Sequence, residues 1–332
     1  MTVPGAVLAV DAGNSKTDVA LVADNGTVLT SVRGAGFHPH LVGAEAAVAG
    51  LHLLVEQVAA EAGFATTEGV ARHVAACLAN ADVPREVERL EVAVAARGWA
   101  PSSTVFNDTY ALLRAGLEQM HGVAVLCGAG TNCTGVHRAG REVRFAAVGH
   151  ISGDWGGGGH LWTEAMWWAA RAADGRGPAT ALREALPAHY GLADMAALVE
   201  AVHLGDVAAE RCPEMTPLLF EVAEAGDVVA GDVVRRQADE LVAFAVAALR
   251  RLDALREPME VVLGGGVVTA GHRLLMERIE TSLAERAPYA SSRVVSAPLV
   301  LGAALLGLDH LGLDGAASTR VRAAYAPDAL PR

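Results

Sequence analysis

The sequence predicts an α/β protein built from two related halves. The chain has 332 residues, a length that suggests about two domains of roughly 100–200 residues each. Short strand-like runs alternate with segments whose apolar residues recur at helical spacing. A meander of strands and turns near the amino terminus recurs about 115 residues later, which indicates a duplicated architecture.

The first half opens as a three-stranded antiparallel meander. Its strands are expected at Leu8–Asp11, Asp18–Ala23 and Val28–Val32, because turn-forming residues separate these apolar runs. Beyond them we expect further strands and helices in alternation: a helix over 43–62, a strand over 73–78, a helix over 83–96, a strand over 104–106 and a helix over 110–120.

The second half begins with a similar meander and continues with helices. Strands are expected over 123–127, 133–137 and 143–148, and residues 161–252 are mostly helical. The later expected elements are a strand over 260–263, a helix over 273–285, a strand over 293–296 and an apolar helix over 299–311. The tail after Gly312 is expected to be weakly ordered.

Composition excludes several classes of protein. Asp and Glu outnumber Lys and Arg by 38 to 26, and no stretch gathers basic residues as a nucleic-acid-binding surface would. The apolar run Leu299–Leu308 is about half the ~20 residues that a membrane span needs. Val7–Val10 leads directly into Asp11 with no basic region before it, unlike a signal peptide. These features predict a cytoplasmic protein with neither a nucleic-acid nor a membrane partner.

The four cysteines and the single lysine carry further information. The cysteines form no CxxC pair, so we expect reduced thiols in the core. Lys16 is the only lysine, and it lies in a glycine-containing turn, where a compact ammonium group could serve a ligand.

Three glycine turns each follow an expected strand directly. They are Asp11–Thr17 (DAGNSKT), Gly128–Asn132 (GAGTN) and Gly264–Gly266. Glycine lets several backbone N–H groups point into one space, as phosphate binding requires. None of the turns matches the P-loop pattern or a GxGxxG between strand and helix, so P-loop and Rossmann nucleotide sites are disfavoured.

Two aspartates have both a chemical and a structural interpretation. Asp11 would be repelled by a bound phosphate unless Mg²⁺ lay between them, or it could simply cap the turn. Asp108, in Phe106–Thr109, could be a general base that takes a proton from an attacking hydroxyl, or the segment could be only a helix N-cap.

The stretch Gly149–Gly159 combines a carboxylate, an aromatic ring and four consecutive glycines. Asp154 and Trp155 could bind a sugar through a polar acceptor and a flat apolar face, or the stretch could be a flexible loop before the next helix. His38 and His40 lie in a loop after the third strand, which could touch a ligand.

Taken together, these motifs resemble the actin-like sugar kinase and heat-shock ATPase superfamily, and within it N-acetylglucosamine kinases of the BadF/BadG/BcrA/BcrD ATPase family. The likeness runs from about residue 7 to about residue 310. The family's DxGxxKT, NDxxxAL, GTGSN and GHxxGDEGS motifs and its adenosine motif are similar here to Asp11–Thr17, Asn107–Leu112, Gly128–Asn132, Gly149–Gly157 and Gly264–Gly266.

The resemblance implies a fold and an activity. The fold would be two actin-like, ribonuclease H-like domains, each a mixed five-stranded sheet flanked by helices, with a cleft between them. The domains would span residues 1–118 and 119–332, and the helix near 299–311 would pack back on the first. The activity would be transfer of the γ-phosphate of ATP, with Mg²⁺, to the 6-hydroxyl of an amino sugar, most simply N-acetylglucosamine.

The resemblance also implies roles for single residues. Asp108 would be the catalytic base, and Asp11 would hold Mg²⁺ through water. ATP would be bound by Gly13, Asn14, Ser15, Lys16, Thr17, Gly128, Gly130, Thr131, Asn132, Gly264, Gly265 and Gly266. The sugar would be bound by His38, Asn107, Asp108, Gly130, Asp154 and Trp155.

Two departures from the family pattern fall on the sugar side. Phe37, His38 and His40 stand where the family commonly carries an asparagine and small residues, and Trp155 replaces the acidic residue after the aspartate of GDEGS. Glucosamine and N-acetylmuramic acid therefore stay open as acceptors.

Two other readings and the assembly state also stay open. One is an activator ATPase of a 2-hydroxyacyl-CoA dehydratase system, since Cys127 and Cys133 flank the second glycine turn. The other is a sugar sensor without catalysis. Family likeness favours a homodimer.

Overall fold

The computed structural model describes residues 5–64, 67, 69–313 and 315–326. They form two five-stranded sheets with helices on their faces, which confirms the predicted fold class. By their contacts, one compact unit contains the residues up to Ala124, Thr134–Ala146 and the residues from Arg293. The other contains Val125–Cys133 and Ala147–Ser292. Because each unit is made of separate stretches of sequence, the units alternate along the chain. The division into domains at residue 118 stays a prediction.

The sheet of the first unit has the order β3-β2-β1-β4-β5. As predicted, β1 (Gly5–Ala12), β2 (Thr17–Val22) and β3 (Val28–Gly34) form an antiparallel meander. The strands β4 (Ala71–Leu78) and β5 (Ser103–Asn107) extend it in parallel with β1.

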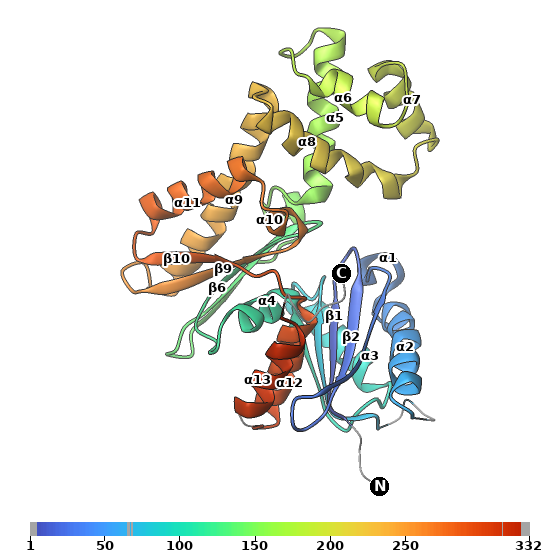
Figure 1. Ribbon diagram of the computed structural model, residues 1–332, viewed down its shortest axis with the longest axis vertical. Coiled ribbons are helices and arrows are strands. Elements are labelled where there is room, and N and C mark those ends of the chain that lie inside the picture. Colours follow the sequence, from blue (N-terminus) through green and yellow to red (C-terminus); the bar gives the residue numbers. More distant parts are fainter. Residues whose placement is uncertain (1–4, 65–66, 68, 314, 327–332) are drawn as a thin grey trace. The chain divides into compact units, whose positions relative to one another are not determined.

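Helices cover both faces of this sheet (Figure 1). One face carries α2 (Ala44–Glu61) and α3 (Pro84–Ala95), and the short α1 (Pro39–Val42) precedes α2. The other face carries α4 (Asp108–Gly116) and α12 (Val300–His310), and α12 lies against β1, β4 and α4.

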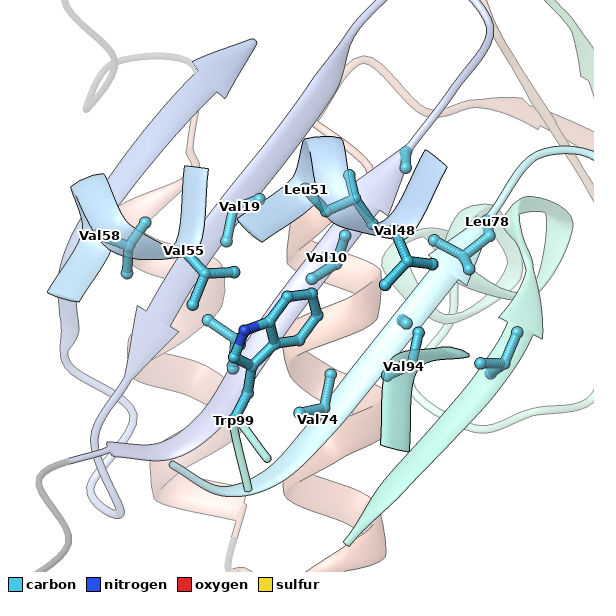
Figure 2. Packing of buried hydrophobic residues seen from close by; sticks show 14 of the residues in the cluster. Val10, Val19, Val48, Leu51, Val55, Val58, Val74, Leu78, Val94 and Trp99 are labelled. Carbon is cyan, nitrogen blue, oxygen red and sulfur yellow. The ribbon is translucent and has the colours of Figure 1, made fainter. Parts of the chain in front are cut away.

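The core beneath α2 is built around the indole of Trp99. Val48, Leu51 and Val55 of α2 lie around it, together with valines of the sheet such as Val10 of β1 and Val74 of β4 (Figure 2). Trp99 is 1% exposed, and its Nε1 donates to Nδ1 of His52 at 3.1 Å, so the one polar atom of the indole is satisfied inside an apolar layer.

The second sheet has the order β10-β9-β6-β7-β8. Its strands are β6 (Gly122–Cys127), β7 (Thr131–Val136), β8 (Glu142–Arg144), β9 (Met259–Gly264) and β10 (Ala290–Val294). The strand predicted over 143–148 ends early, at Arg144. Ala147 has φ 48°, a left-handed conformation that an extended strand cannot contain.

The second unit is largely helical, as predicted. Its helices are α5 (Gly158–Asp174), α6 (Leu182–His189), α7 (Met195–Leu204), α8 (Met215–Glu224), α9 (Val228–Arg251), α10 (Gly266–Thr269) and α11 (Arg273–Arg286), with 3₁₀ turns at Gly149–Ile151 and Ala209–Glu214. None of the described helices is long and apolar enough to cross a membrane.

The expectation of a weakly ordered tail after Gly312 is wrong for residues 315–324. They form α13 (Gly315–Ala324), and the guanidinium of Arg322 donates to the carbonyl oxygens of Arg114 and Leu117. A short segment of low apolar content is thus held as a helix by contacts about 200 residues away in the chain, which local patterning does not reveal. Residues 327–332 of that tail lie outside the described residues.

Candidate active site

In the first unit, the candidate residues meet at the carboxyl ends of three parallel strands. Ala12 of β1 pairs with Leu78 of β4, which pairs with Asn107 of β5. The segments that follow these strands are therefore brought to one edge of the sheet, where α/β proteins commonly bind ligands. Asp11, the turn after it, and Asp108 all lie at this edge.

Asp108 is a buried carboxyl with a raised pKa. Its residue is 8% exposed, and burial raises its pKa from 3.8 to about 6, while backbone N–H groups of Thr109 and of Asp108 itself lower it. A carboxylate with a pKa near 6 accepts protons better than an ordinary aspartate and is still mostly ionised at neutral pH. These are the properties that a general base requires, and the role itself stays a prediction.

Asn107 fixes the start of the helix that carries Asp108. Its Oδ1 accepts hydrogen bonds from the backbone N and from Oγ1 of Thr109, at 3.1 and 2.6 Å. The N-cap is therefore Asn107, and Asp108 is the first residue of α4. The interpretation of Asp108 as a general base stays a prediction.

Asp82 is a member of this cluster that the sequence did not predict. Its Oδ1 accepts a hydrogen bond of 2.8 Å from Nδ2 of Asn107. Burial first, and then the Asp108 charge, raise the pKa of Asp82 to about 7, while Arg144 lowers it. Asp82 lies in the loop between β4 and α3, and its residue type and spacing match no motif.

Asp11 lies close to other carboxylates, which favours a cation. Burial raises its pKa well above 3.8, the charges of Asp108 and Asp18 raise it further, and Lys16 and Arg33 oppose them. Mg²⁺ commonly keeps several waters and takes one or two carboxylates together with phosphate oxygens. The described residues contain no group of three or more His, Cys, Asp or Glu side chains fit to hold a metal by themselves. A water-mediated ion shared with a substrate phosphate fits this donor set.

The first glycine turn is closed by a hydrogen bond of 2.9 Å from the N–H of Gly13 to the Lys16 carbonyl. The Lys16 side chain is 51% exposed, and its Nζ lies 4.0 Å from Asp18, whose carboxylate is already bonded to Arg33 at 2.7 Å. Among the described residues, the buried Oγ1 of Thr17 has no hydrogen-bond partner. An exposed ammonium and an unsatisfied hydroxyl in one turn suit a phosphate group.

The three residues of the loop after β3 that depart from the family pattern have different environments. Phe37 is 3% exposed and belongs to the hydrophobic core of the first unit, so it is a packing residue. His38 and His40 lie outside that core, with ring centroids 5.8 Å apart.

In the second unit, three glycine segments far apart in sequence pack against one another. The N–H of Gly158 donates to the carbonyl of Gly128 at 2.8 Å. A Cβ on Gly157 would lie 2.5 Å from Cα of Gly130, and a Cβ on Gly265 would lie 2.4 Å from the Cys127 carbonyl oxygen. The turn 128–130 is thus held between the 157–159 and 264–266 segments by contacts that only glycine permits.

Thr131 and Asn132 continue this turn as the first residues of β7, and both are buried. The Asn132 Oδ1 accepts a hydrogen bond of 2.7 Å from the N–H of Cys133.

Asp154 and Trp155 both contact neighbouring side chains. Asp154 accepts a hydrogen bond from Oγ of Ser152. Trp155 is 5% exposed, with the Arg236 guanidinium 4.2 Å from its ring centroid and the His160 ring also against it. A ring covered in this way offers little face to a ligand, so a contact of Trp155 with sugar rests on the resemblance alone.

Cys127 and Cys133 are buried free thiols. Burial raises the pKa of Cys127 to about 12, and it also raises the pKa of Cys133. Since iron–sulfur clusters are held by thiolates, these environments disfavour the activator reading.

Two relatives that match this chain are named as kinases. It is 25% identical to an N-acetyl-D-glucosamine kinase of Dictyostelium discoideum over 313 residues, which cover 91% of this chain and 97% of the relative. It is 26% identical to an N-acetylmuramic acid/N-acetylglucosamine kinase of Clostridium acetobutylicum over 196 residues, 58% of this chain and 64% of the relative.

Solved structures share the fold. A candidate N-acetylglucosamine kinase of Chromobacterium violaceum aligns with a TM-score of 0.72 at 21% identity, covering 92% of this chain and 100% of the other. A ROK family glucokinase of Streptomyces griseus aligns with a TM-score of 0.53 at 22% identity, over 92% and 99% of the two chains. The shared fold supports the predicted pair of actin-like sheets.

The family assignment rests on a match that is much longer than any single motif. Residues 8–307 match the model of one family, and this range contains all the motifs described above. The chain therefore belongs to the BadF/BadG/BcrA/BcrD ATPase family.

Proposed function

We propose that the protein is an ATP-dependent kinase that transfers the γ-phosphoryl group to the 6-hydroxyl of an amino sugar, with N-acetylglucosamine as the first candidate. The observation that carries the proposal is the buried Asp108 carboxyl, whose pKa burial raises to about 6, at the strand edge that also holds Asp11. The kinase relatives and the family match support it.

In this reading Asp108 accepts the proton of the sugar hydroxyl as that oxygen attacks the γ-phosphorus. Asn107 holds the first turn of α4, so the carboxylate is oriented before the sugar arrives. Asp11 would hold Mg²⁺ through water, and the bound ion would neutralise phosphate charge.

Phosphate groups of ATP would be bound by backbone N–H groups and side chains of Gly13, Asn14, Ser15, Lys16 and Thr17, and by Gly128, Gly130, Thr131 and Asn132. Gly264, Gly265 and Gly266 would contact the adenosine. His38, Asn107, Asp154 and Gly130 would contact the sugar, and Trp155 would act by supporting the Asp154 loop.

The first test is release of ADP from ATP and Mg²⁺ with a panel of amino sugars, using Asp108→Asn as the blank. Turnover with N-acetylglucosamine supports the main proposal. Turnover with only N-acetylmuramic acid or glucosamine keeps the mechanism and changes the acceptor, an outcome that the dual name of the Clostridium relative makes worth testing. Binding of ATP without turnover on any sugar would contradict the kinase.

We further propose a homodimer that acts in the cytoplasm, where ATP is supplied. Sedimentation equilibrium of the purified protein tests the first statement, and cell fractionation tests the second. A monomer at all concentrations, or recovery outside the cytoplasm, would contradict them.

A further inference from the structure

Two loops at the strand edge of the first unit are tied together by a third. We call residues 13–16 the phosphate turn and residues 35–38 the acceptor loop. The N–H of Phe37 donates to the Gly13 carbonyl at 2.9 Å, so the loop and the turn already share one backbone hydrogen bond. A Cβ on Gly36 would lie 2.1 Å from the carbonyl oxygen of Asn14, so their backbones pack without any intervening side chain.

Asn80, in the loop after β4, joins both of them. Its Nδ2 donates to Oδ1 of Asn14 at 2.8 Å and to the carbonyl of Phe37 at 3.4 Å. The residue before it is anchored as well, because the N–H of Ala79 donates to the carbonyl of Ala12 at 2.8 Å. One amide group thus bridges the phosphate turn and the acceptor loop from a fixed strand end.

The backbone of Asn80 is unusual. Its φ is 63°, a left-handed conformation found at three non-glycine residues of the described chain. Asparagine tolerates it better than most residues, but glycine would adopt it with no steric cost. The sequence therefore keeps a side chain where the backbone alone would favour glycine, which points to a use for the amide.

We infer that Asn80 is a positioning residue that makes the phosphate turn and the acceptor loop move as one body, so that nucleotide binding orders the sugar-binding side. The sugar part of this inference rests on the proposed function. Binding at two sites that share one ordered element is reciprocal: each ligand raises the affinity for the other by the same factor.

The decisive variant is Asn80→Gly, which removes both side-chain hydrogen bonds, while glycine adopts the left-handed backbone conformation without strain. Asp253→Gly is the matched control, because Asp253 also has a positive φ, of 53°, and lies just after α9, outside the candidate site. Gly36→Ala is a second perturbation of the same junction from the other side.

The first measurement is hydrogen exchange of the acceptor loop, followed by mass spectrometry, with and without a non-hydrolysable ATP analogue and Mg²⁺. We expect the analogue to slow exchange at residues 35–38 in the wild type and in Asp253→Gly, and to slow it at least about fivefold less in Asn80→Gly and Gly36→Ala. Equal slowing in all four proteins, or no slowing in the wild type, would overturn the inference.

The second measurement is the affinity for N-acetylglucosamine with and without the same analogue. The wild type should bind the sugar more tightly when the analogue is present, and Asn80→Gly should lose at least about fivefold of this gain. Failure of the wild type to bind or phosphorylate any sugar would count against the proposed function, whereas the exchange measurement would still decide the role of Asn80.

Discussion

The Asp108→Asn variant should be more stable than the wild type while losing its activity. The carboxyl of Asp108 is buried, and its folded-state pKa is raised from 3.8 to about 6 because burial disfavours the charged form. Folding with an ionised Asp108 therefore carries a cost that the proposed catalytic role requires. An asparagine oxygen can accept the same backbone hydrogen bonds without the charge.

The size of the effect follows from the pKa shift. Raising the pKa from 3.8 to about 6 costs about 3 kcal/mol of stability in the wild type when Asp108 is ionised, since each pKa unit corresponds to about 1.4 kcal/mol. The sign depends on pH: the protonated acid favours folding, and this contribution disappears as pH rises from about 4 through about 6. An unsatisfied NH₂ on the new asparagine would return about 1 kcal/mol or more, so we expect a net gain of about 1–3 kcal/mol near neutral pH.

The assay is urea unfolding of both proteins at several pH values between about 4.5 and 7.5, with ADP release measured in parallel. The stability difference should grow as pH rises and level off above about pH 6.5. A variant that is less stable than the wild type at neutral pH, or a difference independent of pH, would refute the assignment of Asp108 as a buried carboxyl held at a cost.

Three further predictions concern other parts of the molecule. In the wild type, kcat/KM for the sugar should fall about tenfold per pH unit below about pH 6, because protonated Asp108 cannot act as a base. The measurement is made at saturating Mg²⁺ and ATP, and a flat profile from pH ~5 to ~8 would contradict the prediction. Asp309→Ala should destabilise the protein by about 3 kcal/mol in urea unfolding, because it leaves the Arg114 guanidinium, which is 7% exposed, without its carboxylate partner. Arg114→Met should cost only about 1 kcal/mol, because the Asp309 carboxylate is 43% exposed and can be hydrated; the reverse order would contradict this. Gly302→Ala should cost about 2 kcal/mol of stability, since its Cβ would lie 1.9 Å from the Ala111 carbonyl oxygen. The control Gly50→Ala has open space around it in α2 and should be neutral or stabilising by up to about 1 kcal/mol. Equal effects of the two changes in thermal unfolding would argue against close packing of α12 on α4.

Local signals predicted the elements and the motif positions well. The structure ends β1 at Ala12 and β5 at Asn107, each one residue beyond the predicted end, and it has the glycine turns at 128–130 and 264–266. These features are encoded by residues within a few positions of each other. Their chemical roles remain predictions, because they depend on ligands.

What local patterning could not show are contacts made across long sequence separations. Asp82 and Asn80 belong to the candidate site only because β4 ends beside β1 and β5. Trp155 looked like an open sugar-binding ring, and it is covered by Arg236, which is about 80 residues further along the chain. The helix α13 was missed for the same reason.

The return of α12 to the first unit has a consequence for biosynthesis. Gly307 packs on Val7 and Gly302 on Ala111, so the sheet face of β1 and β4 is completed by residues made after the entire second unit. A ribosome adds residues at about 5–20 per second. While residues 147–292 are being translated, the apolar sheet face that α12 will cover stays without this helix for many seconds. The nascent chain is therefore expected to depend on chaperones during this interval, and the second unit, which is complete earlier, can fold first.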